Sequence, residues 1–232
     1  MQLSDSHLNL PVQGRNLTTA LAGNVYMTQA TRAARHTLRQ RRKRISLNER
    51  ILFDHAIYQH LLNSGILLRC QHIAGYLAND GEPSNHAFIQ RCQQTNHTYY
   101  LPVINKQKLA FTRYQADTPL ANNKYGIAEP ITNHTLATKF ISAILLPLVG
   151  FDKQGNRLGM GGGFYDRTLN FIQRAPCHKR PLLIGIAYSV QMVKKIDRQT
   201  WDIPLDALVS EKGLLLFNNR SYNLLRHPAS SK

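Results

Sequence analysis

The chain has 232 residues, of which 43% are hydrophobic, and this combination is typical of a globular domain rather than of a disordered polypeptide. The formal net charge of +16 is compatible with nucleic acid, an anionic membrane surface or a small polyanion as ligand, so charge alone does not choose among them. The apolar runs are too short to span a membrane. The three cysteines form no C-x-x-C pair, and we expect a protein of the reducing cytoplasm.

Residues 1–30 show no sustained hydrophobic periodicity and contain Pro11 and Gly14. We predict a disordered or loosely attached arm for this segment. It lacks the apolar core of a secretion signal, which argues against a cleaved targeting peptide.

A basic helix is predicted from residue 31 to residue 44 (TRAARHTLRQRRKR). Arg32, Arg35 and Arg39 follow one another at spacings of three and four, so they share one face of that helix. Two interpretations of this face stay open: a solvated charged surface, which is the commoner case, or a surface that binds phosphate.

The sequence Ser46-Leu47-Asn48-Glu49 is a capping box, and it predicts a second helix that runs to about residue 63 and ends at Gly65. We expect an apolar stripe of this helix to face the core. The stripe consists of Leu47, Ile51, Tyr58, Leu61 and Leu62.

The first predicted strand covers residues 72–78 and ends in a polar turn that contains Glu82. Ligands of open α/β sheets bind at the carboxyl ends of the strands. Glu82 is therefore placed to accept hydrogen bonds from a ring rich in N–H donors. The plainer alternative is an acidic loop residue that caps the following helix.

Helices and strands continue to alternate along the rest of the chain, which predicts an α/β domain from residue 31 to residue 217 with a mostly parallel sheet. Residues 218–232 are predicted to be a basic tail. The expected elements are a helix at 84–94, strands at 98–103, 109–114, 141–149 and 181–187, a helix at 165–171, and a last strand that ends near residue 217.

A glycine-rich loop lies between the predicted strand at 141–149 and the helix that follows it. Gly159 and the run Gly161–Gly163 would let backbone N–H groups approach a phosphate closely. Arg157 could bind that phosphate as a bidentate cation, and Asp166 offers a hard oxygen ligand for Mg²⁺. The loop fits neither the P-loop nor the dinucleotide-binding pattern. A tight turn with glycines at positive φ is the simpler alternative.

The segment from residue 146 to residue 167, with its sequence GNRLG at 155–159 and GFYDR at 163–167, resembles the signature of the 5-formyltetrahydrofolate cyclo-ligase family, also called methenyltetrahydrofolate synthetases. The resemblance implies a three-layer Rossmann-like fold. It also implies ATP-dependent closure of 5-formyltetrahydrofolate to 5,10-methenyltetrahydrofolate, with release of ADP and phosphate and with Mg²⁺ as cofactor. Two shorter matches, YLANDGE at 76–82 and YGIAEP at 125–130, correspond to family segments near the folate.

By this resemblance Arg157 and Tyr165 are expected to be catalytic and Asp166 to bind the metal. In the family, a lysine and an arginine of the first helix approach the nucleotide. The arginine position corresponds to Arg35, but the lysine position is occupied by Thr31. We expect Arg32 to replace the missing lysine. The predicted ATP-binding residues are Arg32, Arg35, Arg157, Leu158, Gly159, Met160, Gly161, Gly162, Gly163, Phe164 and Tyr165. The predicted folate-binding residues are Tyr76, Glu82, Tyr125 and Glu129. For the segment that holds Tyr125 and Glu129, a plain loop ended by proline is an equal alternative.

The expected partners are ATP and 5-formyltetrahydrofolate, with or without a polyglutamate tail, and the expected state is a monomer that binds neither membrane nor specific nucleic acid. Two other functions stay open. The basic helix suits a nucleic-acid-binding protein, although no known nucleic-acid-binding motif accompanies it. The Thr31 substitution suits a nucleotide-binding regulator that has lost catalysis. Covalent catalysis is not expected, because no G-x-S-x-G elbow is present.

Overall fold

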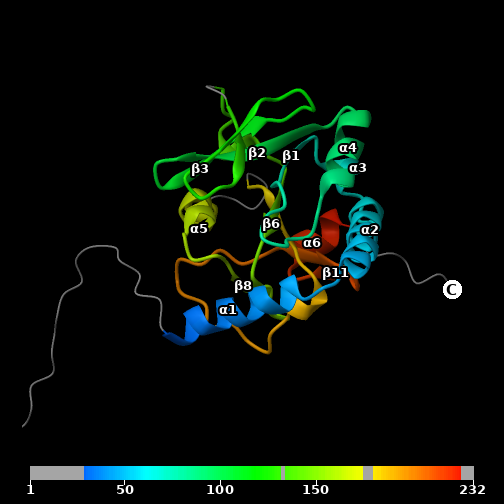
Figure 1. Ribbon diagram of the computed structural model, residues 1–232. Helices are drawn as coiled ribbons and strands as arrows, with labels where there is room; N and C mark the ends of the chain where they lie inside the picture. Colours follow the sequence, from blue (N-terminus) through cyan, green and yellow to red (C-terminus); the bar gives the residue numbers. More distant parts are fainter. Residues whose placement is uncertain (1–28, 132–133, 175–179, 226–232) are drawn as a thin grey trace, which may run out of the picture.

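The computed structural model describes residues 29–131, 134–174 and 180–225, and the predicted N-terminal arm lies outside them up to residue 28. Its centre is a seven-stranded sheet with the strand order β11-β10-β9-β6-β1-β2-β3 (Figure 1). The strands are β1 (His72–Ala74), β2 (Thr98–Asn105), β3 (Lys108–Arg113), β6 (Ala143–Pro147), β9 (Leu182–Ile186), β10 (Ala207–Ser210) and β11 (Gly213–Leu216).

The five inner strands pair in parallel, and the two edge strands, β3 and β11, pair in antiparallel fashion. The predicted mostly parallel sheet is therefore confirmed. Two small hairpins accompany it: β4 (Leu120–Asn122) with β5 (Ala128–Pro130), and β7 (Gly150–Phe151) with β8 (Arg157–Leu158).

Helices cover both faces of the sheet, which gives the three layers expected (Figure 1). Successive residues of β6 alternate between the two cores, since Leu145 packs with α2, α3 and α4 while Ile144 packs with α5. The helices are α1 (Gln29–Lys43), α2 (Leu47–Asn63), α3 (Ile66–Arg69), α4 (His86–Gln94), α5 (Phe164–Leu169) and α6 (Asn219–Leu224), with 3₁₀ turns η1 (Thr138–Phe140), η2 (Asn170–Gln173) and η4 (Ser189–Gln191).

The start and end of α2 are as predicted, and Tyr58, Leu61 and Leu62 pack in the core as expected, but the other two residues of the predicted stripe do not. Ser46 and Glu49 form the capping box, and Gly65 follows the helix with a φ of 74°. The prediction that Leu47 and Ile51 face the core is wrong, because their exposed fractions are 72% and 60%. Ile57 is buried instead, and at 3.6 residues per turn Ile51 lies about 120° around the helix from it.

The chain after β11 does not begin as the predicted tail. Residues 219–224 form α6, whose N-cap Asn218 donates to the carboxylate of Asp206 at 2.8 Å. Arg220 binds the same buried carboxylate at 3.2 Å, and Leu225 is buried. Buried polar partners thus order this end of the domain, and residues 226–232 lie outside the described residues.

Within the described ranges, no helix is long and apolar enough to cross a membrane. The element that matters most for the site is α1, which lies across the edge of the sheet where the parallel strands end (Figure 1). It packs on η4, the turn directly after β9. The loops that follow β1 and β6 emerge at this same edge, so α1 lies against both.

Candidate functional site

The loop after β6 is shaped by the buried carboxylate of Asp152. Its Oδ1 accepts hydrogen bonds from the backbone N–H groups of Gln154 and Asn156, both at 3.0 Å. Its Oδ2 accepts from the Asn156 side chain and from the Ile196 backbone, both at 2.9 Å. These four bonds fix the connection between β7 and β8. Arg157 is the first residue of β8, so its position depends on this connection.

Arg157 and Asp166 form an ion pair across the glycine loop. The Nη2 of Arg157 lies 2.5 Å from the Oδ1 of Asp166, and only 6% of the arginine side chain is exposed. The backbone N–H of Ile203 also donates to this Oδ1, at 3.4 Å. Within the described residues, the buried Nε of Arg157 has no hydrogen-bond partner. A buried donor without a partner is a rare arrangement, and it suits a ligand that brings its own acceptor.

The glycine loop adopts backbone conformations that favour glycine. Gly161 and Gly163 have φ values of 98° and 63°. A Cβ on Gly163 would lie 2.6 Å from the Nη1 of Arg167, whose Nη2 donates to the carbonyl of Gly162. Gly161 and Gly162 are exposed, so the loop opens to solvent. The α-helix that follows is only six residues long and continues as η2, which leaves the arginines as the main source of positive charge.

Helix α1 reaches the glycine loop through Arg35, as the resemblance predicts. The Nε of Arg35 donates to the carbonyl of Gly159 at 2.7 Å. Partial burial lowers the pKa of Arg35, and the nearby carboxylate of Asp202 acts in the opposite direction. Arg32 is exposed and has no hydrogen bond or ion pair within the described part of the chain, so its role in nucleotide binding stays a prediction.

The turn after β1 is held in a strained conformation by arginines. Asp80 and Gly81 have φ values of 51° and 77°, which is unusual for the aspartate. The carbonyl of Asp80 accepts from Arg42 at 2.9 Å, and the carbonyl of Gly81 accepts from Arg50 at 2.7 Å. The Asp80 carboxylate also binds Arg39 and Lys43 at 2.7 and 2.5 Å.

This turn presents Glu82, whose side chain is 12% exposed. One carboxylate oxygen accepts from the backbone N–H of Asn79 at 3.1 Å, and the other lies 3.9 Å from Nη1 of Arg42. Burial raises the pKa of Glu82 to about 7, although Arg42 acts to lower it. Glu82 therefore changes its charge near neutral pH.

Tyr165 lies between the two loops. Burial raises the pKa of its phenol well above the usual value, the charge of Glu82 raises it further, and the charge of Arg157 lowers it. The side chain thus lies within electrostatic range of both the predicted folate carboxylate and the predicted phosphate cation. The segments that carry the two predicted sites therefore come near each other around this residue, while its catalytic role stays a prediction.

The other predicted folate residues lie around the same region in different roles. Tyr76 is buried, and its hydroxyl donates to the carbonyl of Pro83 at 2.9 Å, so it supports the turn that carries Glu82. Tyr125 is exposed and packs edge-on against Phe164, with ring centroids 5.8 Å apart.

Glu129 is engaged within the structure. Its Oε2 accepts from the Ile104 backbone at 3.2 Å and from the Asn123 side chain at 3.1 Å, which ties the β4–β5 hairpin to β2. Direct contact of Tyr76 or Glu129 with folate stays a prediction.

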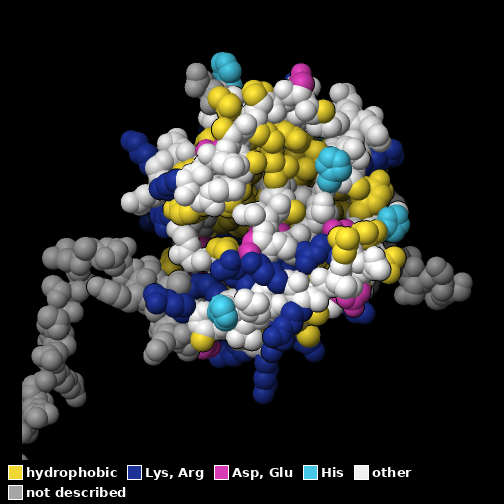
Figure 2. Space-filling model, in the orientation of Figure 1, with side chains coloured by type: hydrophobic (Ala, Val, Ile, Leu, Met, Phe, Trp, Pro, Cys, Tyr) yellow, Lys and Arg dark blue, Asp and Glu magenta, His cyan; other side chains and the backbone are white. Residues whose placement is uncertain are grey.

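The surface around α1 has a basic part and an apolar part. Lysine and arginine side chains gather along α1, and an apolar surface lies above them over the sheet, between α5 and α4 (Figure 2). A charged phosphate group and a flat ring system would each find a matching surface here.

Sequence reasoning missed Arg42, Arg50 and Asp80. Arg42 could have been found, because it continues the spacing of Arg35 and Arg39 by three residues and so lies on the same face of α1. Arg50 and Asp80 gave no such signal, since their partners are backbone carbonyls and side chains distant in sequence.

Comparison with known proteins identifies relatives over most of the chain. The model of the 5-formyltetrahydrofolate cyclo-ligase family matches residues 27–211. The chain is 39% identical over 188 residues to the 5-formyltetrahydrofolate cyclo-ligase of Haemophilus influenzae, a match that covers 78% of this chain and 98% of the relative. It is 32% identical over 178 residues to the Escherichia coli K12 protein of the same name, with 75% and 96% covered.

Solved structures agree with these relatives. The NMR structure of Aquifex aeolicus 5,10-methenyltetrahydrofolate synthetase matches with a TM-score of 0.70 and 26% identity, covering 82% of this chain and 93% of the other. The synthetase of Mycoplasma pneumoniae matches with a TM-score of 0.62 and 25% identity, covering 78% and 98%.

Proposed function

The chain belongs to the 5-formyltetrahydrofolate cyclo-ligase family, and we propose that it converts 5-formyltetrahydrofolate and ATP into 5,10-methenyltetrahydrofolate, ADP and phosphate. One observation carries the proposal beyond the family name. Helix α1 contacts both predicted parts of the site: Arg35 donates to the Gly159 carbonyl at 2.7 Å, and Arg42 donates to the Asp80 carbonyl at 2.9 Å and lies 3.9 Å from Glu82. A site built this way can hold a phosphate donor and a folate ring next to each other.

The chemistry needs positioning rather than a protein nucleophile. The formyl oxygen attacks the γ-phosphorus of ATP, and the bond to ADP breaks. N10 of the folate then attacks the formyl carbon, the carbon–oxygen bond breaks, and phosphate leaves with the former formyl oxygen. N10 loses its proton in the process. Alignment of two bound substrates is a large source of rate enhancement in such a reaction.

Residues of this chain suit the phosphate side of the reaction. Arg157 is mostly buried, and its Nε has no partner within the described residues, so it can bind the transferred phosphoryl group and offset its growing charge. Arg35 touches the glycine loop from α1 and adds a second cation. Tyr165 is our candidate for a hydroxyl that donates to the formyl or phosphoryl oxygen, because Glu82 and Arg157 both influence its pKa.

The donor set also fits a magnesium ion that arrives with the nucleotide. Within the described residues, no group of three or more His, Cys, Asp or Glu side chains could hold a metal by itself. Asp166 has one oxygen engaged by Arg157 and Ile203, which leaves the other available to Mg²⁺ together with phosphate oxygens and water. When bound there, Mg²⁺ would neutralise phosphate charge.

Glu82 suits the folate side. A carboxylate can accept from two adjacent N–H donors of a pterin ring, and such charge-assisted bonds are strong in a buried setting. The apolar surface above α1 can pack against the ring faces (Figure 2).

The basic helix supports this proposal better than it supports nucleic-acid binding. Three of its cations, Arg39, Arg42 and Lys43, bind the carboxylate of Asp80. Part of their charge is therefore offset within the protein, which leaves less of it free to follow a phosphate backbone.

A chromophore assay tests the proposed reaction. Purified protein is mixed with 5-formyltetrahydrofolate, ATP and Mg²⁺, and the absorbance of the methenyl product is followed with each component omitted in turn. We expect product only in the complete mixture. Product without ATP, or folded protein that gives no product in any mixture, would refute the proposal.

A further inference from the structure

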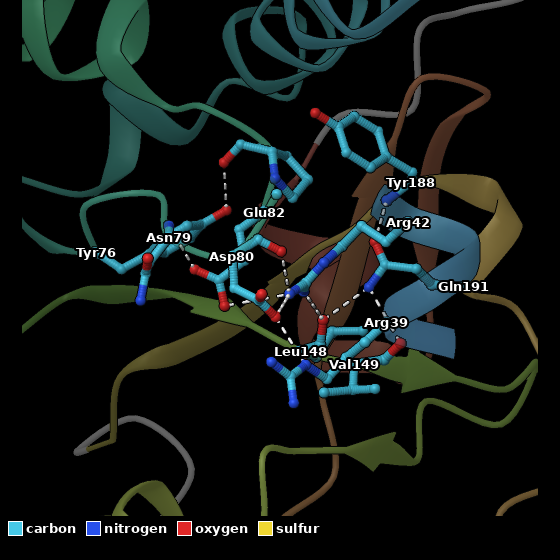
Figure 3. Close-up of polar contacts among 12 residues, drawn as sticks. Arg39, Arg42, Tyr76, Asn79, Asp80, Glu82, Leu148, Val149, Tyr188 and Gln191 are labelled. Carbon is cyan, nitrogen blue, oxygen red and sulfur yellow. Dashed lines mark hydrogen bonds and ion pairs between the residues drawn. The ribbon is translucent and has the colours of Figure 1, made fainter. Parts of the chain in front are cut away.

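Arg42 is a charged side chain with an exposed fraction of 0%, and it lies where three segments of the site meet (Figure 3). Its Nη2 donates to the carbonyl of Asp80 at 2.9 Å and lies 3.1 Å from the carboxylate of that residue. Its Nη1 donates to the carbonyl of Leu148 at 3.2 Å and lies 3.9 Å from Glu82. The guanidinium therefore joins α1, the turn after β1 and the chain leaving β6.

Attachment of α1 alone does not explain a buried guanidinium. Arg39 and Lys43 already tie the helix to Asp80 with shorter contacts. Burial of a charge is costly unless its hydrogen bonds are well satisfied, and here the Nε of Arg42 has no partner within the described residues. What Arg42 adds is an ion pair with Glu82 at 3.9 Å and a bond to the segment that leads to the glycine loop.

The carbonyl of Leu148 is held from two directions. Gln191 donates to it at 2.7 Å and to the carbonyl of Val149 at 3.2 Å, while Arg42 approaches from α1 (Figure 3). The chain leaving β6 is thus fixed against the same guanidinium that faces the Glu82 turn. A shift of either segment would break a bond to Arg42.

We propose that Arg42 is a positioning residue for the reaction: it holds the turn that carries Glu82 at a fixed distance from the segment that leads to the glycine loop, and its positive charge favours the carboxylate form of Glu82. The inference rests on the proposed function, because it takes Glu82 to be the folate carboxylate. No contact of Arg42 with either substrate is needed.

The charged and titratable groups around Glu82 define what the loss of Arg42 should do. Arg42 and Arg39 face it from α1, Asp80 faces it from its own turn, and the phenols of Tyr76 and Tyr165 lie near it. Of these, Arg42 has the largest influence that favours the charged carboxylate. Without it, Glu82 should become ionised only at higher pH.

The test is a pH profile of folate binding, measured by calorimetry with 5-formyltetrahydrofolate over roughly pH 6 to 9. Arg42→Met is compared with wild type and with Arg41→Met, which removes an exposed charge from the same helix. We expect the acid limb of affinity to move up by about one pH unit in Arg42→Met, so that binding at neutral pH weakens about fivefold, and about tenfold at the acid end of the range. Arg41→Met should follow the wild-type profile.

A second comparison separates positioning from mere loss of structure. In a Glu82→Gln background, Arg42→Met should cause no further change in the pH profile, because the titrating carboxylate is gone. Should Arg42→Met fail to fold, Arg42→Lys takes its place; it keeps a charge but cannot bond to both carbonyls, and it should raise KM for folate more than it lowers kcat.

Wild-type behaviour distinguishes the two proposals. If the wild-type protein does not bind 5-formyltetrahydrofolate, the proposed function fails. If the wild-type protein binds but Arg42→Met has the wild-type pH profile, only the positioning role of Arg42 is wrong. The same conclusion follows if Arg42→Lys has the wild-type KM, or if the shift caused by Arg42→Met persists in the Glu82→Gln background.

Discussion

Glu82 is the residue on which the folate half of the account depends. Replacing it with glutamine keeps the acceptor for the Asn79 N–H but removes the charge. A hydrogen bond to a charged group contributes roughly 1.5–3 kcal/mol, so we expect folate affinity to fall by about one to two orders of magnitude. Calorimetry with Mg-ATP should give an unchanged affinity. Weaker nucleotide binding with intact folate binding would show that Glu82 serves the other substrate.

The same carboxyl makes stability depend on pH in a definite direction. Burial raises the pKa of Glu82 from 4.5 to about 7, so the folded protein retains a proton that the unfolded chain loses. The contribution of Glu82 to stability therefore decreases as pH rises from about 4.5 to about 7. In urea unfolding, Glu82→Gln should gain stability relative to wild type across that window. A difference between the two proteins that stays constant with pH would contradict the raised pKa.

Asp166 is the matching residue on the phosphate side. Asp166→Asn removes the negative charge that pairs with Arg157 at 2.5 Å. The same charge would attract Mg²⁺. We expect a higher Mg²⁺ requirement for nucleotide binding and a kcat lowered at least about tenfold, with folate affinity unchanged. Titration of activity with Mg²⁺ at fixed ATP checks this. An unaltered Mg²⁺ requirement would remove Asp166 from the metal site.

Among the elements, the glycine loop is the most sensitive to added volume. Gly163→Ala puts a Cβ at positive φ and 2.6 Å from the Arg167 guanidinium, so the loop must shift. Gly213→Ala, at the start of β11, also puts a Cβ at positive φ, but this Cβ would find no atom within 4 Å. Both should lose about 1–2 kcal/mol of stability through backbone strain. Only Gly163→Ala should raise KM for ATP, by about tenfold, and equal ATP kinetics in the two variants would disprove a nucleotide role for this loop.

Elements were predictable where a local pattern decides them. The capping box at Ser46 and the apolar runs that become β6 and β9 appear in the structure with small shifts at their ends. The exposure of Leu47 and Ile51 was not predictable, because both continue the helical spacing of Tyr58 and Leu62, which pack on the core. Helix α6 depends on Asp206, a carboxylate that the sequence alone does not assign to it.

At the scale of the whole molecule, the sequence predicts the α/β architecture and the family, since both depend on patterns that extend over many residues. It also names Arg35 and Glu82, and in the structure α1 contacts the glycine loop through Arg35 and approaches Glu82 through Arg42. It does not predict the network around Arg42 and Asp80, because that network joins residues about forty positions apart. The monomeric state and the cytoplasmic location remain predictions.

Transfer of the formyl oxygen to phosphate is the most direct test of the proposed activation by ATP. The protein is given 5-formyltetrahydrofolate labelled with oxygen-18 in the formyl group, together with Mg-ATP, and the released inorganic phosphate is examined by mass spectrometry. The account predicts one labelled oxygen in each phosphate formed with the methenyl product. Unlabelled phosphate, with the label released into water, would contradict attack of the formyl oxygen on ATP.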